Sequence, residues 1–197
     1  MRLGTKGNNI MNSISVMQCV VFLGGTLFFL YISKNSLFNL KVHGFYRFFV
    51  FEAILMLILL NFPFWVTEPF SLLQIISWIL LTISLYLVHQ SFFSLKKKSG
   101  TKEREGESAN FKFENTIILL KEGVYKYIRH PMYSSLLFLC LGAFLKNISV
   151  YSLLLTVIAI LFLILTAKTE EKENIAFFGL SYSEYMKGTK MFIPFLF

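Results

Sequence analysis

Residues 123–133 read Gly-Val-Tyr-Lys-Tyr-Ile-Arg-His-Pro-Met-Tyr and join a charged stretch of the chain to a long apolar one. Arg129 and His130 thus stand side by side where a membrane-spanning segment is expected to begin. Ionisable side chains there are costly unless they pair, bind a ligand or reach the interface, so they mark a candidate functional site. Pro131 suits the first turn of a helix and disfavours the helical conformation at His130. We predict a break at His130 and a helix from about Pro131, whose free N–H groups form an anion-receptive corner.

The composition indicates a membrane protein. The chain has 197 residues, of which 55% are hydrophobic, and its mean hydropathy is +0.62. These values exceed those of ordinary soluble domains and predict an all-α bundle that crosses the membrane several times. The net charge of +8 is typical of lysines and arginines that anchor a cytoplasmic side.

Several partner classes are not expected. The chain lacks a basic face interleaved with exposed aromatic residues, which argues against nucleic-acid binding. Cys19 and Cys140 lie inside apolar runs without CxxC spacing or a nearby histidine, so we expect neither a metal site nor a disulfide framework. Nothing in the sequence specifies an oligomeric state.

We interpret residues 1–197 as a single integral membrane domain with three parts. Residues 1–95 contain three apolar runs of membrane-spanning length, which cover residues 14–32, 48–64 and 70–95. Residues 96–110 form a charged cytoplasmic linker rich in Lys, Glu, Gly and Ser. Residues 111–197 form the predicted catalytic core.

The core begins with a short apolar stretch and continues with a helical hairpin. Residues 110–120 are too short to cross the bilayer, so we expect them at the interface. Residues 132–145 and 150–166 are apolar, and Lys146 and Asn147 separate them, which predicts a tight hairpin with arms that are short for a full crossing. Counting both arms gives about five transmembrane helices.

The distribution of basic residues predicts the orientation. Lysine and arginine concentrate after the first, third and fifth runs, whereas the turn at residues 63–69 has none. The connection after the first run contains Lys34, Lys41, His43 and Arg47. With five spans, the N-terminus lies outside or in a lumen and the C-terminus lies in the cytoplasm. Residues 123–133 and the segment after the hairpin then share the cytoplasmic side, where we expect a pocket.

That later segment carries the second polar cluster. Residues 168–174 read Lys-Thr-Glu-Glu-Lys-Glu-Asn, and on a continuing helix Glu170 and Asn174 share a face. Tyr182 and Tyr185 follow three residues apart, on one side of a further helix. Together with Arg129 and His130, these groups suit a site that takes a polar reagent from the cytosol and a hydrophobic substrate from the bilayer.

Soluble cofactor signatures are missing from the chain. It contains no GxGxxG, P-loop, HExxH or GxSxG motif. The residue pattern by itself therefore leaves an enzyme, a transporter and a structural membrane protein open.

The order of the motifs resembles one enzyme family. Gly123-x-Tyr125-x-x-x-Arg129-His130-Pro131-x-Tyr133, followed by Glu170-Glu171 and by Phe178-Gly179-x-x-Tyr182-x-x-Tyr185, resembles the isoprenylcysteine carboxyl methyltransferase family. The wider membrane methyltransferase group includes phospholipid N-methyltransferases. The resemblance covers roughly residues 105–197. It implies an S-adenosylmethionine-dependent methyltransferase whose cytoplasmic cofactor pocket is closed by the C-terminal segment.

The resemblance also implies roles for individual residues. Those expected to line the cofactor pocket are Ile117, Ile118, Leu119, Leu120, Tyr125, His130, Pro131, Met132, Tyr133 and Glu170. Among these, Glu170 would face the cationic part of the cofactor, to which aromatic faces are also attracted. Arg129 would anchor or orient the reactants. Glu171 or His130 would act as a base if the acceptor is an amine.

The implied acceptor is a lipophilic substrate that enters sideways from the bilayer, in contact with membrane lipid. Carboxyl O-methylation of an isoprenylcysteine-like molecule is the first prediction, and N-methylation of a phospholipid headgroup is the alternative. A non-catalytic scaffold or a transporter is the alternative from another class. Two positions depart from the family pattern: Ile117, where members often carry His, and Thr166, where they often carry an Arg associated with the substrate's carboxylate. Lys168 or Arg129 could stand in for that Arg.

Overall fold

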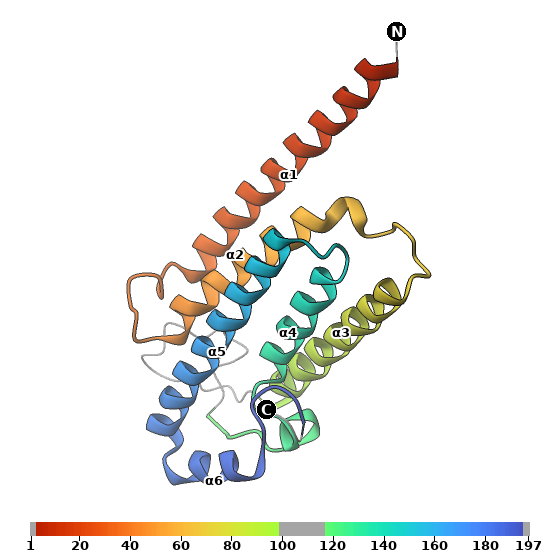
Figure 1. The fold of residues 1–197 in the computed structure, drawn as a ribbon. Coiled ribbons are helices and arrows are strands. Elements are labelled where there is room, and N and C mark those ends of the chain that lie inside the picture. The colour runs from red at the N-terminus through yellow and green to blue at the C-terminus, as the bar shows by residue number, and fades with distance from the viewer. Residues whose placement is uncertain (1–2, 99–116, 195–197) are drawn as a thin grey trace.

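The computed structural model describes residues 3–98 and 117–194, and it is a bundle of α-helices (Figure 1). The helices are α1 (Leu3–Ser33), α2 (His43–Asn61), α3 (Leu72–Lys98), α4 (Pro131–Phe144), α5 (Val150–Phe178) and α6 (Leu180–Gly188). Two 3-10 turns accompany them, η1 (Phe62–Phe64) and η2 (Gly123–Lys126). These residues contain no β-strand, and an isolated parallel bridge joins Ile128 to Lys190. The all-α prediction is confirmed.

Within residues 3–98 and 117–194, four helices are long and apolar enough to cross a membrane. The four stretches are Ser15–Ser33, His43–Phe64, Leu72–Lys97 and Val150–Phe178. The shorter apolar helix α4 has 14 residues, a length of about 21 Å, whereas the hydrocarbon core is about 30 Å thick. The five predicted spans thus correspond to four long helices and one short helix.

Helix α5 runs further than the sequence pattern indicated. The apolar run ends near Thr166, but the helix continues to Phe178 because no glycine or proline interrupts it. It stops at Gly179, whose φ of 62° is readily adopted only by glycine. Glu170 and Glu171 consequently extend from a membrane-spanning helix rather than from a separate segment.

The α4–α5 hairpin is confirmed, and its turn has a clear local cause. Ser149 accepts a hydrogen bond from the Ser152 backbone N–H, and the Ser152 hydroxyl accepts one from the Ser149 N–H. This reciprocal pair is a capping box, which satisfies free N–H groups at the start of α5. At the end of α4, the Asn61 side chain of α2 donates to the carbonyl of Ala143 over 2.9 Å. The hairpin tip therefore lies beside the end of α2.

Small side chains let α3 approach α4 closely. The hydroxyls of Ser77 and Ser84 donate to the carbonyls of Gly142 and Ser135, each over 2.7 Å. A Cβ atom at Gly142 would lie 2.9 Å from the Leu81 side chain, so a larger residue there would push the helices apart. Close backbone approach with hydroxyl hydrogen bonds is a typical way for membrane helices to associate.

The hairpin tip contains a buried cation. Lys146 donates to the side chain of Gln74 over 2.9 Å, and its ammonium lies 3.6 Å from the Trp78 ring centroid. Burial lowers the pKa of Lys146. The Trp78 ring thus compensates part of the cost of removing this charge from water.

We expect Trp78→Leu to lower the free energy of unfolding by about 2 kcal/mol, because a desolvated cation loses its aromatic partner. Equilibrium unfolding in mixed detergent micelles would measure this change. Tyr86→Leu, at an exposed position of the same helix, is the control and should change stability by less than about 0.5 kcal/mol. Equal effects of the two substitutions would contradict a role for the cation–aromatic contact.

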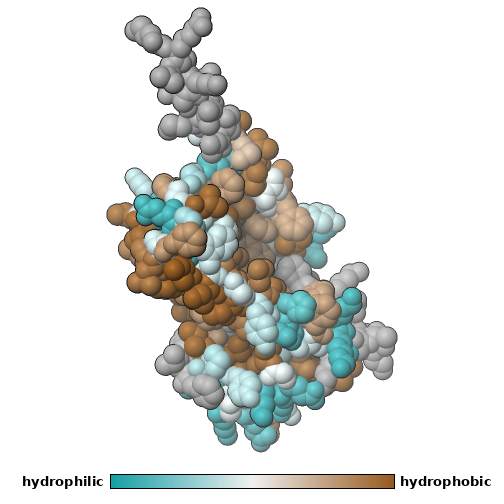
Figure 2. All heavy atoms as spheres, turned by 90° about the vertical axis from the view of Figure 1, so that its right-hand side faces the viewer, coloured by the Kyte–Doolittle hydropathy of each residue, from teal (hydrophilic) through white to brown (hydrophobic). Residues whose placement is uncertain are grey.

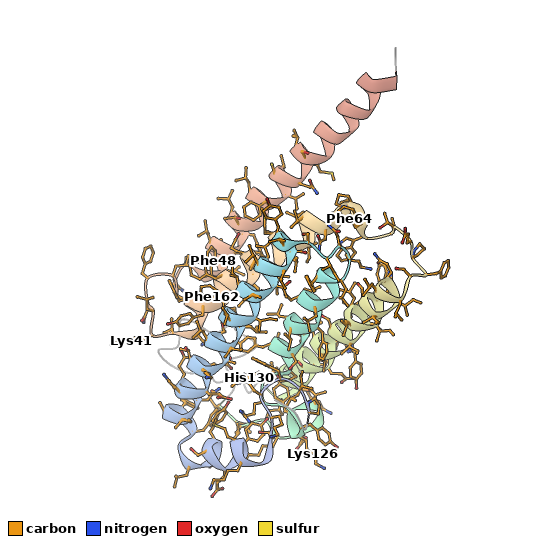
Figure 3. All side chains as sticks on the ribbon, in the orientation of Figure 1. Lys41, Phe48, Phe64, Lys126, His130 and Phe162 are labelled. Atoms are coloured by element: carbon orange, nitrogen blue, oxygen red, sulfur yellow. The ribbon has the colours of Figure 1, made fainter. Side chains whose placement is uncertain are left out.

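Polar residues gather at one end of the molecule. Figure 2 shows hydrophilic side chains at the lower end, where Figure 1 places η2 and α6, and hydrophobic side chains over the bundle. Figure 3 places His130 toward this end, with Lys126 below it and Phe64 at the opposite end. The long apolar helices and the polar end together describe an integral membrane protein.

One local expectation was wrong. The sequence pattern placed His43 and Arg47 in a connecting segment, but α2 begins at His43 and buries both side chains. The reason is a tertiary contact, since the His43 backbone N–H donates to the Glu173 side chain of α5 over 2.8 Å. That contact stabilises a helix start for which the preceding residues supply no side-chain cap.

Candidate functional site

A cavity lies at the polar end, where the end of α3, residues 119–120, η2, the start of α4, the end of α5 and α6 meet. It encloses about 730 Å³, including the part that is open to solvent.

The helix break predicted at His130, within the motif of residues 123–133, is confirmed. His130 has φ −121° and ψ 62°, outside the helical region, and α4 begins at Pro131. The Ser134 backbone N–H then donates to the His130 carbonyl over 2.9 Å, which closes the first turn. The buried His130 ring is stacked on Tyr133, with ring centroids 5.3 Å apart. Pro131 thus holds both rings at the cavity wall.

Arg129 joins three segments of the chain. Its Nε donates to Glu171 of α5 over 2.7 Å, and its Nη1 donates to the carbonyls of Met186 and Thr189. The Arg129 and Glu171 side chains are only 10% and 9% exposed. A planar guanidinium presents five donors in a rigid fork, whereas a lysine carries its three donors on a single nitrogen. Arg129 therefore connects the motif to α5 and to the segment after α6.

The two adjacent glutamates face different surroundings. His130 lies between them, with Nδ1 3.7 Å from Glu170 Oε2 and Nε2 3.4 Å from Glu171 Oε1. Glu170 is 27% exposed at its side chain and lines the cavity, where it also contacts Tyr133. Glu171 is directed to Arg129 instead. The corner predicted to receive an anion is thus flanked by the protein's own carboxylates.

The C-terminal segment pairs with the motif. The N–H groups of Arg129 and His130 donate to the carbonyls of Lys190 and Met191 over 2.8 and 3.2 Å. The Ser134 hydroxyl donates to the carbonyl of Phe192 over 2.7 Å, and the Phe192 side chain is fully buried. Residues 189–192 therefore bind the backbone of the motif and the start of α4, and they do not line the cavity.

Helix α6 contributes two buried tyrosines. The Tyr185 hydroxyl donates to the carbonyl of Tyr125 in η2 over 2.5 Å. Burial raises the pKa of Tyr185, and burial together with the charges of Glu170 and Glu171 raises the pKa of Tyr182. Both phenols consequently stay protonated at neutral pH and act as hydrogen-bond donors.

Most residues that the resemblance assigned to the site lie together at this cavity. Those that line it are Leu119, Leu120, Tyr125, Arg129, His130, Pro131, Met132, Tyr133 and Glu170. Ile117 and Ile118 do not line it, and their side chains are 39% and 57% exposed. Glu171 lies behind the wall, bound to Arg129.

Six further residues line the cavity: Leu95, Glu173, Asn174, Phe178, Tyr182 and Tyr185. The sequence pattern had grouped Asn174, Tyr182 and Tyr185 with the candidate site and Phe178 with the motif, whereas Leu95 and Glu173 had no predicted role. Helical spacing from Glu170 could have found Glu173, because positions three apart share a face. No local signal identifies Leu95, since its place at the cavity depends on how α3 packs against η2.

A model of the phospholipid methyltransferase family matches residues 72–179, which is more than half of the chain. The chain belongs to the phospholipid methyltransferase family. The matched segment runs from α3 to the end of α5 and contains Arg129, His130, Glu170 and Glu171. The prediction of the membrane methyltransferase group is therefore confirmed. No curated protein and no solved structure matches the chain.

Thr166 is a departure from the resemblance that the fold explains. Its side chain is completely buried, and its hydroxyl donates to the carbonyl of Phe162 one turn earlier in α5. In this member of the phospholipid methyltransferase family, the residue at this position packs in the core and does not line the cavity.

Proposed function

We propose that the protein is a membrane-embedded methyltransferase that binds S-adenosylmethionine in the cavity beside His130 and Glu170. The observation that carries this proposal is the Glu170 carboxylate, which lines the cavity, whereas the neighbouring Glu171 is bound to Arg129. S-adenosylmethionine carries a sulfonium and an ammonium group, both of which a carboxylate attracts. When bound, it supplies a methyl group from the sulfonium for in-line displacement by the acceptor.

The rest of the cavity wall fits such a molecule. The aromatic side chains of Tyr125, Phe178 and Tyr182 line it, and aromatic faces attract cations. Apolar side chains from Leu95, Leu119 and Leu120 offer a surface for an adenine ring. The wall thus combines apolar and aromatic side chains with polar groups that can orient a ligand.

The chain's own residues would act mainly by positioning. Arg129 is held by Glu171 and by two backbone carbonyls, so we assign it to orienting the motif rather than to a direct contact with substrate. Accurate placement of two reactants can lower a barrier by up to about 7–11 kcal/mol. The buried His130, Tyr133 and Tyr182 side chains would exclude water from one side of the cavity.

We infer a lipophilic acceptor that reaches the cavity from the bilayer, and we favour carboxyl O-methylation of an isoprenylcysteine-like molecule. A carboxylate is already a nucleophile and needs no base, which agrees with Glu171 being engaged by Arg129. N-methylation of a phospholipid amine is the second candidate, and the family match does not distinguish the two acceptors. An amine acceptor would need a base, for which His130 at the cavity wall is the candidate.

We further infer that the cavity faces the cytoplasm. Lys126, Lys187 and Lys190 lie on η2, on α6 and directly after α6, whereas the α4–α5 turn at the other end contains only Lys146. Excess lysine and arginine mark the cytoplasmic side of membrane proteins.

Calorimetric titration of the detergent-purified protein with S-adenosylmethionine tests the proposal. We expect saturable binding in the micromolar range, because the cavity offers one carboxylate and several aromatic faces to the cofactor. A folded protein that does not bind would overturn the proposal. Methyl transfer from labelled cofactor to prenylcysteine analogues and to amine phospholipids, assayed in parallel, would then distinguish the two acceptors.

A further inference from the structure

The start of α2 reaches the wall of the cavity through one residue. The His43 backbone N–H donates to Glu173 Oε1 over 2.8 Å, and His43 Nδ1 lies 2.5 Å from Glu173 Oε2. Both oxygens of a glutamate that lines the cavity are therefore held by one residue from another helix. His43 is only 1% exposed, whereas the Glu173 side chain is 21% exposed at the cavity.

The contact restricts the Glu173 side chain. Val42 precedes α2 without a side-chain cap, and the carboxylate of Glu173 takes the place of one. A carboxylate at a helix N-terminus is stabilised by the free N–H groups and by the helix dipole. With both oxygens engaged, Glu173 cannot turn its charge into the cavity.

We propose that His43 is a positioning residue of the cofactor cavity, holding Glu173 in the wall. The inference rests on the proposed binding of S-adenosylmethionine. It adds that α2, which lies outside residues 72–179 of the family match, completes the site. Helix α2 is then part of the binding machinery as well as of the membrane anchor.

Calorimetry with S-adenosylmethionine on two variants tests this role. His43→Leu removes the ring contact and should weaken binding by about tenfold or more, since small displacements of a site can have effects of that size. His43→Asn keeps an N–H donor near the position of Nδ1 and should bind within about threefold of the unchanged protein. Rescue by Asn would not follow from a loss of stability alone, because both variants lose the buried imidazole.

A matched control separates binding from folding. Asn61 is also buried on α2, and its side chain makes a hydrogen bond at the far end of the bundle. Asn61→Leu should lower the unfolding temperature, as His43→Leu does, and leave the dissociation constant unchanged. In addition, Glu173→Ala combined with His43→Leu should bind no more weakly than Glu173→Ala alone, because the two residues act through one contact.

The outcomes distinguish this inference from the proposed function. Binding by the unchanged protein together with unchanged binding by His43→Leu would overturn the role of His43 and leave the proposed function standing. Equal losses in His43→Asn and His43→Leu that track their unfolding temperatures would also overturn it. A folded, unchanged protein that fails to bind S-adenosylmethionine would overturn both.

Discussion

Replacing Glu170 with Gln is expected to weaken S-adenosylmethionine binding by about 10-fold to about 150-fold, which corresponds to loss of one charge-assisted contact of about 1.5–3 kcal/mol. The substitution keeps the shape of the side chain and removes the charge that lines the cavity. Because the side chain is 27% exposed, the effect on folding should be small. Calorimetric titration would measure the dissociation constant, and thermal unfolding would check the fold.

Glu184→Gln provides the matched control for Glu170→Gln. Glu184 is an exposed carboxylate on α6, so its substitution makes the same change in net charge away from the cavity wall. We expect its dissociation constant to stay within about twofold of that of the unchanged protein, as for most surface substitutions. Glu170→Gln binding as tightly as Glu184→Gln would remove the main support for the proposed cofactor site. Titration with S-adenosylhomocysteine, which lacks the sulfonium, would show which cationic group Glu170 contacts.

Arg129→Met should lower the free energy of unfolding by about 3–5 kcal/mol, since it leaves Glu171 buried without its partner. It also removes the side-chain bonds to the carbonyls of Met186 and Thr189, so the motif keeps only its bonds to Lys190, Met191 and Phe192 in the segment after α6. We therefore expect S-adenosylmethionine binding to be lost even where the protein still folds. Equilibrium unfolding in mixed micelles and calorimetric titration would measure the two effects.

Two further variants separate charge from geometry at Arg129. Arg129→Lys keeps the charge but carries its donors on a single nitrogen and lacks the fork geometry of the guanidinium, so it should remain clearly less stable than the unchanged protein. The double variant Arg129→Met with Glu171→Met removes the buried charge altogether and should be more stable than Arg129→Met alone. It should still fail to bind cofactor if Arg129 orients the motif. An Arg129→Met protein as stable as the unchanged one would contradict the connecting role.

The fold places the neighbouring residues Glu170 and Glu171 in different surroundings. Successive residues of an α-helix point about 100° apart, so the two carboxylates cannot share one environment. Glu170 faces the cavity and Glu171 faces Arg129. The sequence placed the pair on the right segment, and only the packing of α5 against α4 and η2 decided which of the two is directed to the cavity.

Several features of the protein could be predicted from the sequence alone, because neighbouring residues determine them. The break at His130 and the helix from Pro131 follow from the steric limits that proline imposes on itself and its predecessor. The α4–α5 hairpin follows from two apolar runs separated by Lys146 and Asn147. The motif order was also sufficient to indicate the membrane methyltransferase group. All of these depend on neighbouring residues or on fixed patterns along the chain.

Tertiary structure decided where α2 begins and what surrounds the cavity. His43 starts a helix because Glu173, 130 residues away, accepts its N–H. Leu95 precedes residues 123–133 in the sequence and Tyr185 follows them, yet both line the same cavity. Such contacts join residues distant in sequence, and they form because buried N–H groups and charges must find partners inside the folded protein. No short stretch of sequence carries that information, because the partner is chosen by the packing of whole helices.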